Sequence, residues 1–273
     1  MTKKTIFSTG ISFSDYYKSL NKSFLQIFKK HHMLHYPFFR EHGESLEKRQ
    51  QNLTDFCASN LSVAPHHTVL DVGCGNGVQS LYLADKLRPK KMMAIDINED
   101  NVLLAQSINT NGVRFNVDNA EKLSSIENQS VDVLLCVESA FHYPDKASFL
   151  AQVNRVLKPN GVFLIADILS KSYKNRWIIG KWKRKMYYYH WTEEDYNREF
   201  RENGLVIDKQ TNITSEVIKG YHGYEAWIKS SQCKNYLQFL IMRAFISIQV
   251  LLNVYLLKKR RHYMVFRGTK TLV

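Results

Sequence analysis

A glycine-rich turn directly after a short apolar segment constrains the fold of this chain more than any other feature. Residues 69–72 have the composition of a buried strand, and a helical pattern runs from 80 to 87. Between them lie three glycines at alternate positions: Gly73, Gly75 and Gly77. A strand, a glycine turn and a helix form half of a nucleotide-binding βαβ unit, in which bare backbone approaches a ligand closely. We therefore expect a ligand at this turn, within reach of Asp71.

A second strand, residues 92–97, supports the same interpretation. Its acidic residue Asp96 lies 21 positions after Gly75 (96 − 75). A carboxylate at about this distance can accept hydrogen bonds from both ribose hydroxyls of a nucleoside. A dinucleotide fingerprint would require a further glycine at position 78, which is Val78 here. The pattern therefore favours a nucleoside other than a dinucleotide, with an ordinary glycine turn as the alternative.

The Asp-x-Gly-x-Gly-x-Gly form of residues 71–77 resembles the first motif of class I S-adenosylmethionine (SAM) dependent methyltransferases. The segment 131–167 resembles the small-molecule branch of that family, through a Glu-x-x-x-His-x-Pro-Asp run from Glu138 and a Lys-Pro-x-Gly turn at 158–161. That branch includes natural-product and sugar O-methyltransferases, tocopherol-type enzymes and sterol C-methyltransferases. The resemblance implies a doubly wound, Rossmann-like α/β fold. Its seven-stranded sheet would be mostly parallel, with an antiparallel last strand.

The resemblance also implies SAM as the cofactor, S-adenosylhomocysteine as the product, and no metal. Asp118 and Ala120 match an Asp-x-Ala segment that binds adenine, and Tyr36 lies where the family covers the cofactor. Tyr36 could equally be an ordinary core or surface aromatic. The expected cofactor-binding residues are Asp71, Gly73, Gly75, Gly77, Asp96, Ile97, Asp118, Ala120 and Tyr36.

Three further residues are candidates for catalysis. His142 follows the fourth predicted strand and Asp167 ends the fifth, and these two strands are neighbours in the usual order of this fold. Some sugar O-methyltransferases have a histidine and an aspartate at the matching places. We therefore predict His142 as general base and Asp167 as its orienting partner, with a pocket-wall role for His142 as the alternative. Glu138 lies near the substrate in sterol-type relatives, but could instead cap a loop or contact the SAM amino group.

The chain divides into three predicted parts: a helical cap (1–62), a SAM-binding core (63–168), and a C-terminal part (169–273) with a substrate cover and the last strands. The basic, aromatic residues 170–190 and the apolar helix 236–257 lie where the family places its substrate cover. They favour a lipophilic or aromatic acceptor. The helix is long enough to span a bilayer, but Arg243 in its interior argues against a span. A lid, a subunit contact in a homodimer, and peripheral membrane contact through 236–261 remain open.

Charge and cysteine content narrow the function classes. The net charge of +13 among 273 residues suggests an acidic partner, although charge runs are often only solvated surface. Nucleic acid is an unlikely acceptor, because residues 138–141 lack the Asn/Asp-Pro-Pro-aromatic motif of enzymes that methylate exocyclic base nitrogens. Four cysteines without metal spacing, and a start without signal-peptide layout, lead us to expect a cytoplasmic protein.

The sequence as a whole predicts a methyltransferase for a small acceptor, methylated at oxygen. The alternatives are C- or N-methylation of a sterol-like or lipid-like acceptor, a protein that binds SAM without catalysis, and RNA methylation.

Overall fold

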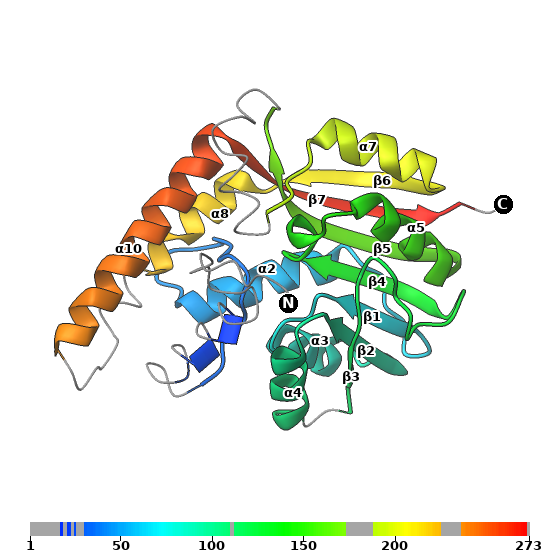
Figure 1. The fold of residues 1–273 in the computed structure, drawn as a ribbon, viewed down its shortest axis with the longest axis horizontal. Coiled ribbons are helices and arrows are strands. Elements are labelled where there is room, and N and C mark those ends of the chain that lie inside the picture. Colours follow the sequence, from blue (N-terminus) through cyan, green and yellow to red (C-terminus); the bar gives the residue numbers. More distant parts are fainter. Residues whose placement is uncertain are drawn as a thin grey trace, which may run out of the picture.

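A seven-stranded sheet forms the centre of the computed structural model (Figure 1). The structure describes residues 17, 18, 21, 22 and 25 and the ranges 30–109, 112–172, 188–224 and 236–271. The strands are β1 (Thr68–Val72), β2 (Lys91–Asp96), β3 (Arg114–Val117), β4 (Val131–Val137), β5 (Leu157–Ser170), β6 (Leu205–Asn212) and β7 (Arg261–Lys270). Their order is β3-β2-β1-β4-β5-β7-β6. The first five strands are parallel, and β7 is antiparallel to both of its neighbours. The predicted fold class is confirmed.

Helices cover both faces of the sheet (Figure 1). They are α2 (Leu46–Ser59), α3 (Val78–Leu87), α4 (Glu99–Ser107), α5 (Lys146–Val156), α7 (Glu193–Glu202), α8 (Thr214–Gly220) and α10 (Tyr236–Lys259), with a 3-10 turn η1 (Ala140–His142). Side-chain caps define several helix starts, because they satisfy backbone amides that have no partner inside the helix. Ser45, Asn98 and Asp145 each accept from an amide of the first turn. Thr192 and Asp195 form a capping box at the start of α7.

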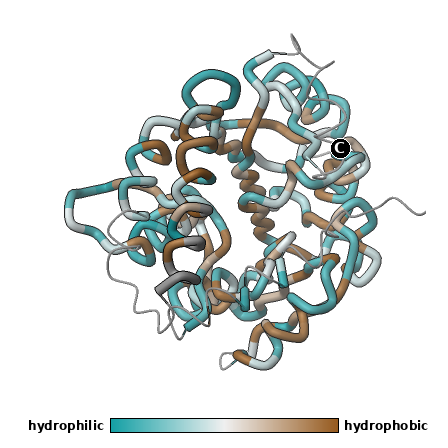
Figure 2. The backbone as a smooth tube through the Cα atoms, turned by 60° about the vertical axis from the view of Figure 1, so that its left-hand side comes forward, coloured by the Kyte–Doolittle hydropathy of each residue, from teal (hydrophilic) through white to brown (hydrophobic). Residues whose placement is uncertain are grey.

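Two apolar cores lie on opposite faces of the sheet. One contains Leu53 of α2 and Leu83 of α3, and the other contains Phe149 of α5 and Tyr196 of α7. Hydrophobic segments gather in the interior and hydrophilic turns surround them (Figure 2). β4 is buried along nearly its whole length, as expected for a parallel strand covered on both sides. Because β4 packs against apolar side chains on both faces, the position of its carboxyl end, where the site lies, is well defined.

The sequence missed or overextended some element boundaries. The expected turn 158–161 is part of the long strand β5, with only Asn160 in the left-handed region at φ 61°. Of residues 216–232, for which the sequence predicts a helix, those up to Gly220 belong to α8 and 222–224 are again helical, whereas 225–232 lie outside the described residues. Most of the expected helix from Ser14, and the basic aromatic residues 173–187, lie outside the described residues. In the part of the chain that the structure describes, no helix has the length and hydropathy of a membrane span.

A buried polar cluster joins β5 to α7. Asp167 is fully buried, and its carboxylate accepts from Tyr196 Oη at 2.6 Å and from the Ile168 amide at 2.8 Å. The ammonium group of Lys146, also buried, donates to the Tyr189 carbonyl and lies over the Trp191 ring. Burial raises the pKa of Asp167, and the positive charge of Lys146 partly offsets the effect. The cluster stabilises the contact between sheet and helix.

Replacing Tyr196 by phenylalanine tests this cluster. Tyr196→Phe removes one donor from a buried carboxyl group, so the free energy of unfolding should fall by about 1–3 kcal/mol in denaturant titrations. Tyr255→Phe, at a tyrosine that is 54% exposed, is the matched control and should change the free energy by less than about 0.5 kcal/mol. Equal effects of the two substitutions would contradict a structural role for the Asp167–Tyr196 bond.

Candidate active site

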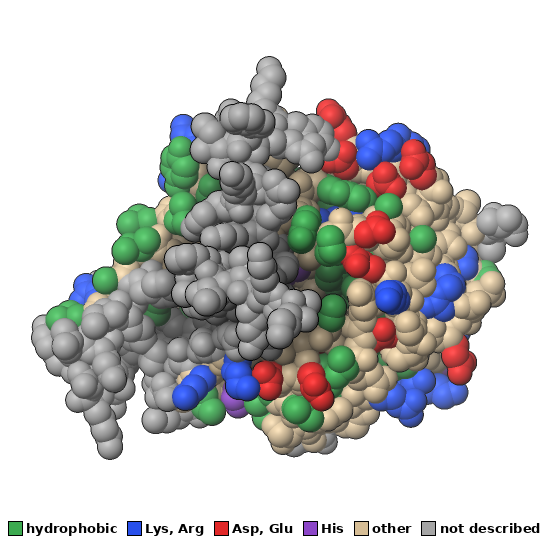
Figure 3. Space-filling model, in the orientation of Figure 1, with side chains coloured by type: hydrophobic (Ala, Val, Ile, Leu, Met, Phe, Trp, Pro, Cys, Tyr) green, Lys and Arg blue, Asp and Glu red, His purple; other side chains and the backbone are tan. Residues whose placement is uncertain are grey.

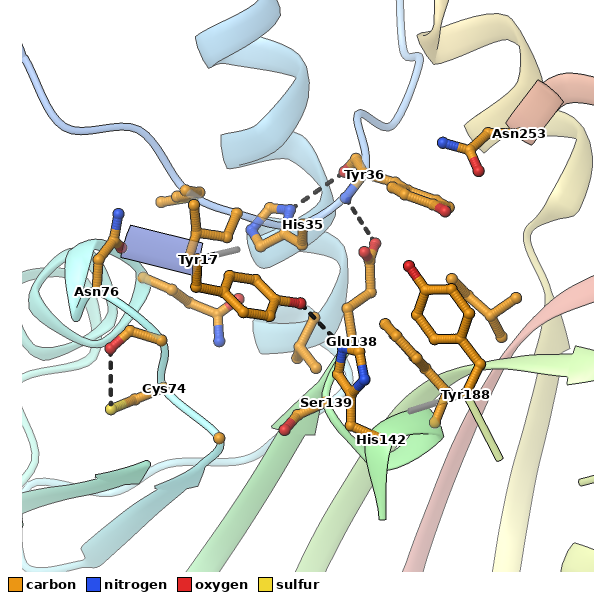
Figure 4. A pocket seen from close by; sticks show the side chains of 18 of the residues that line it. Tyr17, His35, Tyr36, Cys74, Asn76, Glu138, Ser139, His142, Tyr188 and Asn253 are labelled. Carbon is orange, nitrogen blue, oxygen red and sulfur yellow. Dashed lines mark hydrogen bonds between the residues drawn. The ribbon is translucent and has the colours of Figure 1, made fainter. Parts of the chain in front are cut away.

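A cavity of about 320 Å³ lies at the carboxyl ends of β1, β2 and β4. The segment 33–36 and the helix α10 contribute to its walls, together with η1 and residues 188–190. The predicted site residues that line it are Tyr36, Gly73, Gly75, Asp96, Glu138 and His142. Figure 4 shows that the side chains of Tyr36, Glu138 and His142 come from separate segments and lie around one space. The carboxyl edge of an open parallel sheet is where ligands of such folds bind.

Asp96 holds the glycine loop in place. Its carboxylate accepts from the Gly75 amide at 2.9 Å and from the Asn98 amide at 2.8 Å. The amides of Gly73 and Cys74 donate to the Ile95 carbonyl, which ties the same loop to β2 a second time. Burial raises the pKa of Asp96, and the two amides partly offset the effect. The acid that the sequence assigns to a ligand therefore also shapes the loop beside that ligand.

Two of the three glycines are required by close contacts. Gly73 has φ +77°, and a Cβ there would lie 1.8 Å from Ser139 Oγ. Gly77 has φ +80°, and a Cβ there would lie 2.5 Å from the Ala105 side chain. Gly73 therefore lets the loop approach the end of β4, whereas Gly77 lets α3 begin against α4. Gly77 does not line the cavity, so its structural role is helix packing.

Asp71 lies beneath the cavity and not in its lining. The side chain is fully buried and accepts from Ser80 Oγ at 2.7 Å and from Gln79 Nε2 at 3.4 Å. Burial raises the pKa of Asp71 to about 6. In this structure Asp71 fastens the first turn of α3 to β1, and its expected contact with the cofactor stays a prediction.

The aromatic segment around Tyr36 is bound to the rest of the site by side-chain amides. Asn76 Nδ2 donates to the His32 carbonyl at 2.8 Å, and Gln50 Nε2 donates to the His35 carbonyl at 3.1 Å. The Tyr36 amide donates to Glu138 Oε1 at 2.6 Å. Sequence reasoning missed Asn76 and Gln50, since nothing in a single sequence shows which distant carbonyl an amide will reach. These bonds hold the segment over the glycine loop.

Glu138 is a buried carboxyl group in a strained backbone position. Its φ is +50°, in the left-handed region that non-glycine residues rarely adopt. Burial raises the pKa of Glu138 to about 8, although the Tyr36 amide and the Tyr263 hydroxyl partly offset the effect. The carboxyl group is therefore mostly protonated at neutral pH. Strain and a shifted pKa in one lining residue are typical of functional sites.

His142 is placed by aromatic contacts. Its Nε2 lies 2.9 Å from Tyr17 Oη, and its ring stacks on Tyr188 with centroids 5.4 Å apart (Figure 4). The predicted pairing of His142 with Asp167 stays a prediction. Ile168 lines the cavity, and successive side chains of a strand project to opposite faces. The Asp167 carboxylate accepts from Tyr196 of α7, and a backbone hydrogen bond at Phe141, the neighbour of His142, offsets part of the rise in its pKa.

The residues expected to bind the cofactor after β2 and β3 do not all lie beside the cavity. Ile97 follows Asp96 and is 59% exposed, so its side chain is accessible next to the site. Asp118 accepts from the amide and hydroxyl of Ser125, and Ala120 is buried in the core on the other face. Neither Asp118 nor Ala120 lines the cavity. Among the described residues no group of three His, Cys, Asp or Glu side chains has metal-binding geometry.

Comparisons with known proteins place this site in a family. A family model described as a methyltransferase domain matches residues 64–221. A fatty-acid O-methyltransferase of Mycolicibacterium smegmatis is 35% identical over 119 residues, which cover 43% of this chain and 41% of that protein. A phthiotriol/phenolphthiotriol dimycocerosates methyltransferase of Mycobacterium leprae is 34% identical over 153 residues, covering 56% and 49%. The chain thus spans less than half the length of these relatives.

Solved structures share the fold. A putative sarcosine dimethylglycine methyltransferase from Galdieria sulphuraria superposes with a TM-score of 0.77 over 93% of this chain and 98% of its own, at 15% identity. The cyclopropane synthase MmaA2 from Mycobacterium tuberculosis superposes with a TM-score of 0.71 over 86% and 89%, at 14% identity. Because the sequence identities are only 14–15%, these matches show a shared fold alone.

Alanine substitution tests the close contact between Gly73 and Ser139, and Gly43, a second glycine with positive φ, serves as the control. Gly73→Ala should abolish SAM binding in calorimetry and lower the melting temperature, because the new Cβ overlaps Ser139. Gly43 has φ +82° with no atom within 4 Å of a built Cβ, so Gly43→Ala carries the backbone strain alone. It should retain SAM binding within about twofold. Loss of binding in both variants would contradict the role assigned to the contact.

The raised pKa of Glu138 predicts a pH effect on stability. Its folded pKa of about 8 lies above its ordinary 4.5, so the folded state binds the proton more tightly. The stability that this provides is complete below pH 4.5 and is lost as the pH rises through 8. Glu138→Gln should therefore gain at least about 1.4 kcal/mol relative to wild type between pH 5 and 8, measured by denaturant unfolding. A pH-independent difference between Glu138→Gln and wild type would contradict the shift.

Proposed function

The chain belongs to the methyltransferase-domain family, and we propose that it is a SAM-dependent methyltransferase that methylates a small lipophilic acceptor at oxygen. The observation that carries this proposal is the cavity itself. It brings the glycine loop, Asp96 and His142 together beside an apolar helix. The names of the relatives support a lipid-like acceptor, since one is a fatty-acid enzyme and the other a phthiotriol enzyme.

The residues at the carboxyl rim fit a nucleoside cofactor. Gly73 and Gly75 present backbone without side chains to the cavity, and Asp96 offers a carboxylate for ribose hydroxyls. Ile97 adds an exposed apolar side chain next to Asp96, suited to the face of a base. SAM, when bound, supplies an electrophilic methyl group, and S-adenosylhomocysteine is the expected product. Tyr36 lines the same cavity, and its ring packs against Tyr221 at the end of α8.

His142 is the proposed general base. Histidine suits proton acceptance near neutral pH, and this ring lines the cavity from η1, next to the end of β4. The Tyr17 hydroxyl oxygen lies 2.9 Å from His142 Nε2. The hydroxyl of an acceptor would have to take this same position to donate its proton to Nε2. Stacking on Tyr188 restrains the ring plane. His142 would hold the acceptor oxygen and take its proton as the new bond forms.

Methylation at carbon is the second candidate, and Glu138 favours it. A carboxyl group with a pKa of about 8 and the aromatic rings of Tyr36 and Tyr188 surround one part of the cavity (Figure 4). Aromatic faces stabilise a positive charge such as the one that forms when an alkene is methylated. The ionised fraction of Glu138 could then accept the proton that leaves the carbon. This route would depend on Glu138 and not on His142.

Replacing His142 distinguishes the two routes. With tritiated-methyl SAM and a lipid extract as acceptor, His142→Gln should lower turnover about 100-fold for a hydroxyl acceptor, because proton removal loses its base. The affinity for SAM should stay within about twofold. His66→Gln, at an exposed histidine, is the matched control and should keep full activity. Unchanged turnover in His142→Gln would remove His142 from the mechanism, and loss in Glu138→Gln alone would favour methylation at carbon.

A further inference from the structure

Arg261 reaches the active-site cavity because β7 is antiparallel to the rest of the sheet. The first residue of β7, Arg261, pairs with Ser170, the last residue of β5. The start of β7 therefore lies at the rim where the parallel strands end. The Arg261 side chain lines the cavity, whereas Lys258, Lys259 and Arg260 just before it are exposed.

The guanidinium of Arg261 is surrounded by tyrosines and not by acids. Its Cζ lies 5.9 Å from the centroid of the Tyr188 ring. Burial lowers the pKa of Arg261, with the hydroxyls of Tyr36 and Tyr221 among the groups that offset it. Among the described residues no carboxylate forms an ion pair with Arg261. Arg267 on the same strand provides the contrast, because it pairs with Asp208.

The acids in the cavity lining do not supply the missing anion. Asp96 is occupied by the amides of Gly75 and Asn98. Glu138 accepts from the Tyr36 amide, and its pKa of about 8 keeps it mostly neutral at pH 7. A cation shielded from water without a counter-ion is costly, and a ligand that brings the anion recovers this cost.

We propose that Arg261 binds the anionic head group, a carboxylate or a phosphate monoester, of an amphiphilic acceptor. The alkyl chain of that acceptor would lie along Leu252 and Leu256, which α10 presents to the same cavity. This inference rests on the proposed function, of which it specifies the substrate class. It assigns Arg261 to orientation of the acceptor and leaves proton transfer to the residues discussed above.

Binding of three ten-carbon probes tests the head-group site. Decanoate, decyl phosphate and decanol are titrated calorimetrically into the full chain in the presence of S-adenosylhomocysteine. Arg261→Gln should weaken binding of one or both anions about 10-fold or more, because the variant loses the charge-assisted hydrogen bonds to the head group. Binding of decanol should change less than twofold. Arg261→Lys should restore part of the anion affinity, and the anion that responds more identifies carboxylate or phosphate as the head group.

Several results would overturn the inference. They are a failure of both anions to bind wild type, unchanged anion affinity in Arg261→Gln, and an equal loss for decanol. The affinity for S-adenosylhomocysteine and the melting temperature report whether each variant is folded. Because the titration requires no methyl transfer, selective anion binding without any methylated product would refute the proposed function and leave the head-group site standing.

The outer face of α10 carries a second, independent observation. Three of its exposed apolar side chains, Ile248, Leu251 and Tyr255, are spaced three and four residues apart, which places them on one side of the helix. Ile248 is 62% and Leu251 69% exposed, and Leu240, eight residues before Ile248, is exposed as well. Figure 3 shows hydrophobic side chains along the outer edge of this helix.

Positive charge surrounds this apolar stripe. Lys258, Lys259 and Arg260 are exposed at one end of α10, and Arg243 is exposed within it. Lys171 joins the basic end, where its ammonium donates to the Lys258 carbonyl at 3.0 Å. No Asp or Glu follows Glu225 in the chain. An apolar stripe flanked by lysine and arginine is suited to the boundary between anionic head groups and acyl chains.

We infer that the outer face of α10 docks on the surface of an anionic bilayer. The opposite side of the helix lines the cavity, so docking would bring a lipophilic acceptor next to the site. The exposed Lys258, Lys259, Arg260 and Arg243 are complementary in charge to an anionic lipid surface, which is the occupant we infer.

Vesicle sedimentation tests the docking surface separately from activity. Wild type should sediment with phosphatidylcholine vesicles that contain 30% phosphatidylglycerol, and much less with phosphatidylcholine alone. Ile248→Glu/Leu251→Glu should lower the bound fraction at least about 10-fold while SAM affinity is kept. Leu103→Glu, at a leucine that is 56% exposed on α4, should bind like wild type. An unbound wild type, equal loss in Leu103→Glu, or a solution dimer that the double variant disrupts would overturn docking on lipid.

Discussion

The hydrogen bond from the Gly75 amide to Asp96 is the interaction on which the site depends. It joins the end of β2 to the glycine loop after β1, and the sheet order makes these strands neighbours. Gly73 then brings the same loop against Ser139 at the end of β4. Three strand ends are thus held at one rim, and the carboxylate that shapes the loop remains part of the cavity wall. A ligand at this rim meets a surface that exists before it binds.

The elements that position the site could be predicted from local sequence signals. Apolar runs, glycines and capping residues act within a few positions, and β1 differs from the predicted strand 69–72 by one residue at its start. The side on which a strand residue projects is harder to predict. β5 is apolar on both faces, so its sequence does not show whether Asp167 or Ile168 faces the ligand. The partnership of His142 and Asp167 therefore stays a prediction.

Long-range placement was also beyond the sequence. The sequence suggests that the basic residues 258–261 lie together on one surface. In the structure the start of β7 places Arg261 in the cavity, whereas residues 258–260 are exposed. The amides that fasten the segment around Tyr36 likewise find carbonyls far away in the chain. These long-range placements bring an apolar helix, tyrosines, one arginine and Glu138, whose pKa is raised, to a single cavity. They make the acceptor side of the cavity chemically distinct from the cofactor side.

Calorimetric titration of SAM into wild type and Asp96→Asn tests the central claim most directly. An amide keeps the size of the side chain, but it replaces the carboxylate that holds the Gly75 amide and faces the ribose position. We expect saturable binding to wild type at one site and a loss of affinity of about 10-fold or more in the variant. Asp85→Asn, an exposed aspartate on α3, should bind SAM as wild type does. Equal affinity of wild type and Asp96→Asn, or no binding to either, would contradict the account.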